Sequence, residues 1–260
     1  MSASTVPLDD QSPKKASPLI RVLSQIRWPV LSGFAPDRVA DTLAGQEFGK
    51  TYPLRERAQE SQFLLTPDGV TQQVGGVLHR FASGDGTWAV TLAATFVAVE
   101  TSAYKSHDDF IPRLASVVGQ LKGHLPLQRW DRFGYRYTNR ITDEDDLSEL
   151  TRLFDPSVVG TVGLDFPDDI VHTVGETVYQ GEDASLLVKS AYLPPNASID
   201  PTIPPAPQRT WLLDLDAFAT GPSSAFSDAE IQQQAALLSK KAHGFFAKVT
   251  TDDFRNRFDV

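Results

Sequence analysis

Hydrophobic and polar residues alternate along several stretches of the chain, as they do in strands that bury one face. The first stretch, 19–28, ends at Pro29, and the next three are separated by turn sequences rich in Gly, Asp and Ser. These three predicted strands are 62–66, 70–82 and 88–101. Within the middle one, Gly75-Gly76 predicts a bulge or a bend.

Two later segments instead repeat apolar residues every three or four positions, the spacing of an amphipathic helix. The first begins at Ser106 with capping-box spacing and has Pro112 in its first turns. Its apolar face consists of Phe110, Leu114, Val117 and Leu121. The second begins at Ser227, and Glu230 completes a capping box. Its apolar stripe is Ile231, Ala235, Leu238, Ala242, Phe245 and Val249.

The order of strand, short helix, three strands and long helix occurs twice. Short helices are expected at 37–43 and 146–154, and the strands of the second round are 130–141, 171–180, 185–192 and 210–215. We therefore predict an α+β fold of two pseudo-duplicated β-α-β-β-β-α halves, with antiparallel sheets each packed against a long helix. The expected organisation is a disordered leader at 1–17 and two halves, 18–128 and 129–260, in one compact unit. A proline-rich stretch, 193–207, predicts a long loop.

Composition narrows the function classes. The net charge of −9 argues against general binding of nucleic acid or anionic membranes, although the predicted paired sheets are analogous to the saddle of the TATA-binding protein. The absence of cysteine excludes disulfides, thiolate metal sites and cysteine nucleophiles. Neither a secretory signal nor a run of about 18 apolar residues is present, so a cytoplasmic location is expected.

Other short motifs favour structural roles. The segment 44–51 fits a loose phosphate-loop pattern, but it lacks the strand before and the apolar helix after, so we interpret Gly45 as a helix C-cap and Gly49 as a turn. No two histidines have metal-ligand spacing, and the acidic run 143–146 precedes a predicted helix, where carboxylates cap free N–H groups. The sequence therefore predicts no catalytic residue, metal or cofactor.

The strand at 132–141 is the most unusual segment. Its alternation places Phe133, Tyr135, Tyr137, Asn139 and Ile141 on one face and Arg132, Gly134, Arg136, Thr138 and Arg140 on the other. Such an arginine row could bind carboxylates or phosphates, or it could pair with acids on neighbouring strands, which is the commoner arrangement. We take Arg132, Arg136, Asn139 and Arg140 as candidate binding residues, and we expect a structural role for Arg136 and a binding role for Arg140.

Several of these segments also carry a family resemblance. The resemblance lies in Ile26-Arg27-Trp28-Pro29, in Trp88-Ala89-Val90-Thr91-Leu92 and, most specifically, in 132–141. In these segments the chain resembles a sporadically distributed prokaryotic family of roughly this length, whose biochemical role is not established. Such a distribution is typical of defence or toxin–antitoxin cassettes.

The resulting function hypothesis is a non-enzymatic binding or regulatory module that recognises a protein partner or a small anionic ligand. The alternative is an enzyme that acts on an anionic small molecule between the sheets, with a carboxylate such as Glu100 beside the arginines. The oligomeric state is left open.

Overall fold

The computed structural model describes residues 14–66, 69–125, 129–221 and 226–259. Most of the predicted leader, the turn at 67–68 and the boundary at 128 lie outside these residues. In the described part, the strands form one nine-stranded antiparallel sheet in the order β2-β3-β4-β5-β1-β6-β9-β8-β7. The α+β class is therefore confirmed.

The strands are β1 (Leu19–Arg27), β2 (Leu54–Thr66), β3 (Gly69–Ala82), β4 (Trp88–Ala93), β5 (Phe96–Thr101), β6 (Arg132–Ile141), β7 (Thr173–Gln180), β8 (Ser185–Leu193) and β9 (Thr210–Thr220). The helices are α1 (Pro36–Ala44), α2 (Glu47–Thr51), α3 (His107–Lys122), α4 (Glu144–Ser148), α5 (Leu150–Leu153), α6 (Pro156–Val159), the 3₁₀ helix η1 (Gly160–Gly163), α7 (Asp228–Val249) and α8 (Asp252–Arg257).

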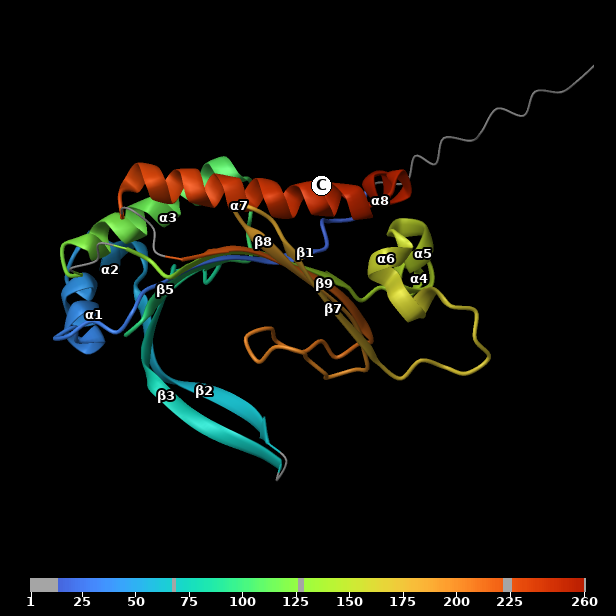
Figure 1. The fold of residues 1–260 in the computed structure, drawn as a ribbon, viewed down its shortest axis with the longest axis horizontal. Coiled ribbons are helices and arrows are strands. Elements are labelled where there is room, and N and C mark those ends of the chain that lie inside the picture. The colour runs from blue at the N-terminus through green and yellow to red at the C-terminus, as the bar shows by residue number, and fades with distance from the viewer. Residues whose placement is uncertain (1–13, 67–68, 126–128, 222–225, 260) are drawn as a thin grey trace, which may run out of the picture.

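The two long helices, α3 and α7, lie across one face of an arched sheet (Figure 1). Both begin as predicted, because the Ser106 hydroxyl accepts from Asp109 N and the Ser227 hydroxyl accepts from Glu230 N. The β2–β3 hairpin and the loop between β8 and β9 extend on the opposite side of the arch (Figure 1). None of the described helices has the length and apolar character needed to cross a membrane.

The central ladder joins the two predicted halves into one sheet. β1 pairs with β6, so the expected separate sheets are continuous. The predicted strand 88–101 is two strands, β4 and β5, that turn at Ala94 and Thr95. The first half therefore has one strand more than predicted, and the pseudo-duplication is not confirmed. The predicted irregularity at Gly75-Gly76 is confirmed by a shift in the β2–β3 register there.

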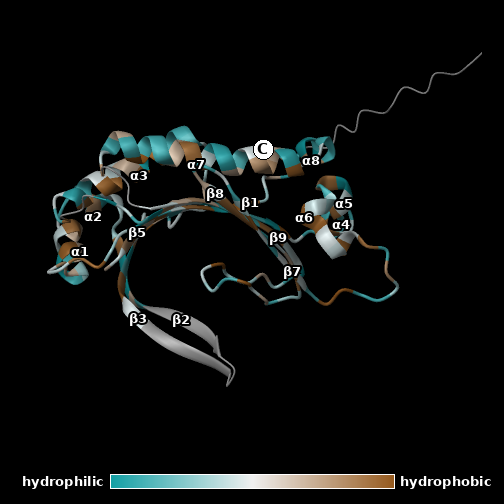
Figure 2. Cartoon of the chain, viewed as in Figure 1, coloured by the Kyte–Doolittle hydropathy of each residue, from teal (hydrophilic) through white to brown (hydrophobic). Residues whose placement is uncertain are grey.

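The core lies between the sheet and its helices, with brown apolar positions on the helix sides that face the strands (Figure 2). On β6, the side chains of Phe133 and Tyr135 are both 0% exposed, as expected from the alternation of the strand. Tyr137 is half-buried, and its hydroxyl lies 2.8 Å from Ser239 Oγ on α7 and 3.1 Å from the Tyr104 hydroxyl. The aromatic face of β6 thus contacts the long helix.

The segment 44–51 contains a helix end followed by α2. Gly45 caps α1, as predicted. The expected turn at Gly49 is wrong, because Gly49 lies inside α2, where a Cβ would stand 2.0 Å from the carbonyl oxygen of Ala44. Glycine is therefore required for the close contact between α1 and α2.

The ends of the described chain meet beside α4. Lys15 N donates to the carbonyl of Arg257, and Asp259 N donates to the carbonyl of Lys15. The buried Asp146 carboxylate pairs with Lys15 and with Arg257. These contacts attach residues near both termini to the second half of the fold.

The charged face of the sheet as the candidate functional site

The sheet face opposite α3 and α7 carries a group of arginines and carboxylates, which we call the charged face. It is formed on five strands and consists of Arg21, Arg80, Glu100, Arg132, Arg136, Arg140, Asp214 and Asp216. The arginine row of β6 lies here, because its alternating neighbours Phe133, Tyr135 and Ile141 are buried on the helix side. The predicted division of this strand into two faces is therefore confirmed.

Arg136 has the most extensive ion pairing of the row. Its Nε donates to both carboxylate oxygens of Asp214, at 2.8 and 3.0 Å, and its Nη2 donates to Asp200 Oδ2 at 2.7 Å. Asp214 is 1% exposed and also accepts from the Thr138 hydroxyl. Burial alone would lower the pKa of Arg136, but the charges and hydrogen bonds of Asp214 and Asp200 outweigh it and raise this pKa. This geometry agrees with a structural role for Arg136.

Arg132 also pairs with a neighbouring strand. Its Nη2 donates to Asp216 Oδ2 at 2.7 Å, and its guanidinium lies 4.7 Å from the ring centroid of Phe218. Burial raises the pKa of Asp216, and the charge of Arg132 opposes that shift. Gly134 leaves room for this pair, since a Cβ there would stand 2.6 Å from Arg132 Nη1 and 3.2 Å from Asp216 Oδ1.

Glu100 joins the two halves of the charged face. Its Oε2 accepts from Arg21 Nε at 2.7 Å, and its Oε1 accepts from Arg80 Nη2 at 3.1 Å. The Arg21 guanidinium also donates to the Thr202 hydroxyl in the loop between β8 and β9. Both oxygens of this carboxylate are therefore occupied by guanidinium groups.

Arg140 differs from the other arginines of β6. Its Nη2 donates to the carbonyl of Pro204 at 2.5 Å, while its Nε is buried without a hydrogen-bond partner. No carboxylate among the described residues pairs with it. Burial without a counter-charge lowers the pKa of this guanidinium. Arg140 is therefore a partly buried cation with unused donor capacity.

The fourth candidate, Asn139, does not join the arginines. It lies on the helix side of β6, is 3% exposed, and donates from Nδ2 to the carbonyl of Leu213 at 3.3 Å. The structure thus brings Arg132, Arg136 and Arg140 together on one face and places Asn139 on the other.

Sequence reasoning missed the acids that neutralise the row. Asp214 and Asp216 are two positions apart on β9, and Arg132 and Arg136 are four apart on β6, so in each strand both residues point to one face of the sheet, and this even spacing was a usable signal. Asp200 had no such signal, because it lies in the loop between β8 and β9 and reaches Arg136 across 64 positions of sequence.

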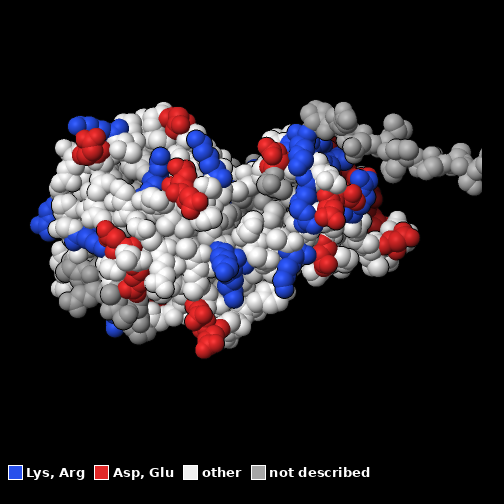
Figure 3. Space-filling model, turned by 90° about the horizontal axis from the view of Figure 1, so that it is seen from above, with Lys and Arg blue, Asp and Glu red and all other residues white. Residues whose placement is uncertain are grey.

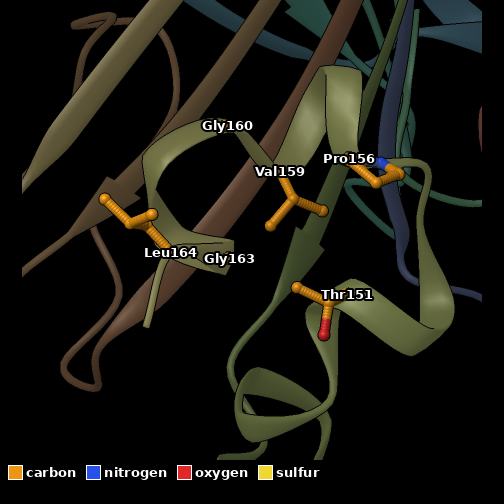
Figure 4. A pocket seen from close by; sticks show the side chains of 6 residues that line it. All are labelled: Thr151, Pro156, Val159, Gly160, Gly163 and Leu164. Carbon is orange, nitrogen blue, oxygen red and sulfur yellow. The ribbon is translucent and has the colours of Figure 1, made fainter. Parts of the chain in front are cut away.

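Other surfaces offer shallower features. A hollow of about 440 Å³ lies beside α5, α6 and η1. It is lined by the residues labelled in Figure 4, which are Thr151, Pro156, Val159, Gly160, Gly163 and Leu164. Over the helix-covered side of the molecule, charges of both signs are interspersed (Figure 3). No cluster of three or more His, Asp or Glu side chains suited to a metal ion occurs in the described ranges.

Comparison with known proteins gives no match, either to a family model or to a curated protein. The function is therefore argued from the charged face itself.

Proposed function

We propose that the protein is a binding module that recognises an anionic group, on a partner protein or a small molecule, through the charged face. The observation that carries this proposal is the state of Arg140, whose guanidinium has one carbonyl partner and no carboxylate among the described residues. A bound carboxylate or phosphate supplies the missing counter-charge. Charge-assisted hydrogen bonds of this kind contribute about 1.5–3 kcal/mol.

The neighbouring ion pairs support the same proposal. Arg132 and Arg136 are held by Asp216 and Asp214, so the strand that carries Arg140 is fixed before a ligand arrives. A rigid support lowers the entropy that binding costs.

The enzyme alternative requires a free general base near the arginines. Glu100 was the candidate, but both of its oxygens accept hydrogen bonds from Arg21 and Arg80. This arrangement favours a structural role for Glu100 and therefore favours binding over catalysis.

Inorganic phosphate is a suitable probe for the anion site. In a titration at constant ionic strength, followed by the NMR signals of the arginine Nε–H groups, we expect a saturable shift of the Arg140 signal. Arg140→Gln should weaken phosphate binding about tenfold or more, the effect of losing a charge-assisted hydrogen bond.

Arg27→Gln is the matched control. Arg27 lies on the same side of the sheet, over Phe96, and has no carboxylate partner among the described residues, but its Nε donates to Gln25 Oε1 at 2.8 Å, unlike the Nε of Arg140. Phosphate binding should survive this change. Equal loss in both variants, or an unshifted Arg140 signal in the wild type, would show that Arg140 is not the anion site.

A further inference from the structure

The outer edge of β7 is a second surface with unused binding groups. β7 ends the sheet, and no described strand pairs with its outer side. Gly181 N donates to the carbonyl of Ala184, which fixes the alternation of hydrogen-bonded pairs along the β7–β8 ladder. By that alternation, the backbone N–H and C=O groups of Val174, Glu176, Val178 and Gln180 point away from β8 toward the free edge.

Natural sheet edges are usually protected by lysine, proline, bulges or short length. β7 has eight residues with neither lysine nor proline, and its single charged residue is Glu176. All but its first residue are exposed. The edge is therefore open to the addition of another strand.

Apolar side chains are concentrated beside this edge. Of the eight strongly exposed large hydrophobic residues in the described part of the chain, three lie on β7 (Val174, Val178 and Tyr179) and three in the segment that leads into it (Leu164, Phe166 and Val171). The hollow of Figure 4 adjoins them, since η1 forms one wall and the Thr161 hydroxyl donates to the Thr173 hydroxyl at the start of β7. An added strand would find apolar contacts along its length.

The segment that carries the edge is acidic, although basic side chains of other elements adjoin it. Residues 160–184 contain no lysine or arginine and six acids, which are Asp165, Asp168, Asp169, Glu176, Glu182 and Asp183. Glu176 pairs with Lys189 of β8 at 2.8 Å, and the guanidinium of Arg209 donates to the carbonyl of Ile170. The other five acids form no ion pair with a described residue, whereas Lys241 Nζ of α7 lies 2.9 Å from the position of a Cβ at Gly181. The segment 160–184 therefore has more acidic than basic groups around it and favours a cationic ligand.

We propose that the β7 edge binds an extended segment of a partner protein in which basic and apolar residues alternate. The segment adds a tenth strand, with main-chain hydrogen bonds to the outward groups of β7, apolar contacts to Val174 and Val178, and cationic side chains near the acids. A second copy of this chain fits poorly, because antiparallel self-pairing would bring two sets of six acids together. This surface is separate from the anion site at Arg140.

A labelled eight-residue peptide that alternates lysine and valine, the length of β7, tests the proposal by fluorescence anisotropy at low salt. We expect it to bind, and we expect the alternating glutamate–valine peptide not to bind. N-methylation of the peptide's alternate amides, which removes the main-chain donors, should abolish binding. If the N-methylated peptide binds equally well, the main-chain hydrogen bonds do not contribute to binding. The contact is then electrostatic, and the proposal of an added strand is wrong.

Protein variants locate the site. Val178→Pro removes an outward N–H without breaking a β8 bond and should abolish binding, whereas Val178→Thr keeps the donor and should retain it. Asp168→Lys/Asp169→Lys should weaken binding about tenfold, while the control Glu47→Lys/Asp108→Lys, with the same charge change on α2 and α3, should weaken it much less.

Two results would contradict the binding of a partner segment at the β7 edge. Binding that persists unchanged in Val178→Pro, with the fold verified by circular dichroism, would place the peptide elsewhere. Dimerisation in sedimentation experiments that Val178→Pro abolishes would show that a second copy of the chain occupies this edge.

Discussion

The centre of the sheet and the segment that carries its β7 edge both contain carboxylates, but these carboxylates differ in whether they have partners. At the centre, Arg132 and Arg136 pair with acids on β9, and the backbone of β6 is bonded on both sides. In the segment 160–184, five of the six acids have no ion-pair partner among the described residues, and half of the backbone groups of β7 face its free edge. A charged residue by itself therefore does not indicate a binding site, because a neighbouring residue can neutralise it. We propose that a ligand binds where groups lack such partners, at the Nε of Arg140 and along the β7 edge.

The largest expected difference in stability is between truncating a tyrosine at the centre of the sheet and truncating one on β7. Tyr135 is 0% exposed in the core, so Tyr135→Ala should lower the free energy of unfolding by about 3–5 kcal/mol. Tyr179 is 48% exposed on β7 and contacts Phe245, so Tyr179→Ala should cost about 1 kcal/mol or less. Urea denaturation of both variants measures this difference, and similar losses would break the comparison.

Removing a carboxylate at the centre and one on β7 should show the same contrast in stability, with a smaller difference than for the tyrosines. Asp214→Ala leaves the guanidinium of Arg136 with only Asp200, so we expect a loss of about 3 kcal/mol, as for a broken buried pair. Glu176→Ala removes an exposed pair with Lys189, whose contribution is about 0.5 kcal/mol. Thermal denaturation at neutral pH should resolve the two, and an equal shift in melting temperature would contradict the assigned roles.

A pH dependence should come from the buried imidazole of His79. Burial, and then the charge of Arg55, lower its pKa, although Asp37 opposes the shift. The unfolded chain therefore takes up a proton near pH 6.5 while the folded chain does not, so stability is lost as pH falls below that value. The lowered pKa values of Asp37 and Asp200 act only at lower pH, below about 4.

Melting temperatures between pH 7 and pH 5 test this assignment. The wild type should lose stability across this range, and His79→Gln should lose less. An unchanged slope in the variant would show that His79 is not the titrating group.

The local sequence pattern predicted much of the fold, and it predicted that the arginines of β6 share one face. The alternation of β6 predicted its buried and charged faces, and the serine caps predicted where α3 and α7 begin. The turn between β4 and β5 was missed, because Ala94 and Thr95 provide none of the Gly, Pro, Asn or Asp signals of a turn.

The state of each arginine depends on residues far away in sequence. Asp214 lies 78 positions from Arg136, and the carbonyl that contacts Arg140 lies 64 positions away. Local periodicity shows that a row of arginines exists, but only strand pairing and the position of the loop between β8 and β9 determine which of them is neutralised.

The most direct test of the account measures stability and phosphate binding in Arg136→Gln and Arg140→Gln side by side. Arg136→Gln should lower the free energy of unfolding by about 3 kcal/mol, because the buried Asp214 loses its counter-charge. Arg140→Gln should change stability by no more than about 0.5 kcal/mol and should weaken phosphate binding about tenfold or more. Wild-type phosphate binding in Arg140→Gln, or a loss of stability equal to that of Arg136→Gln, would contradict the division between paired and unpaired arginines.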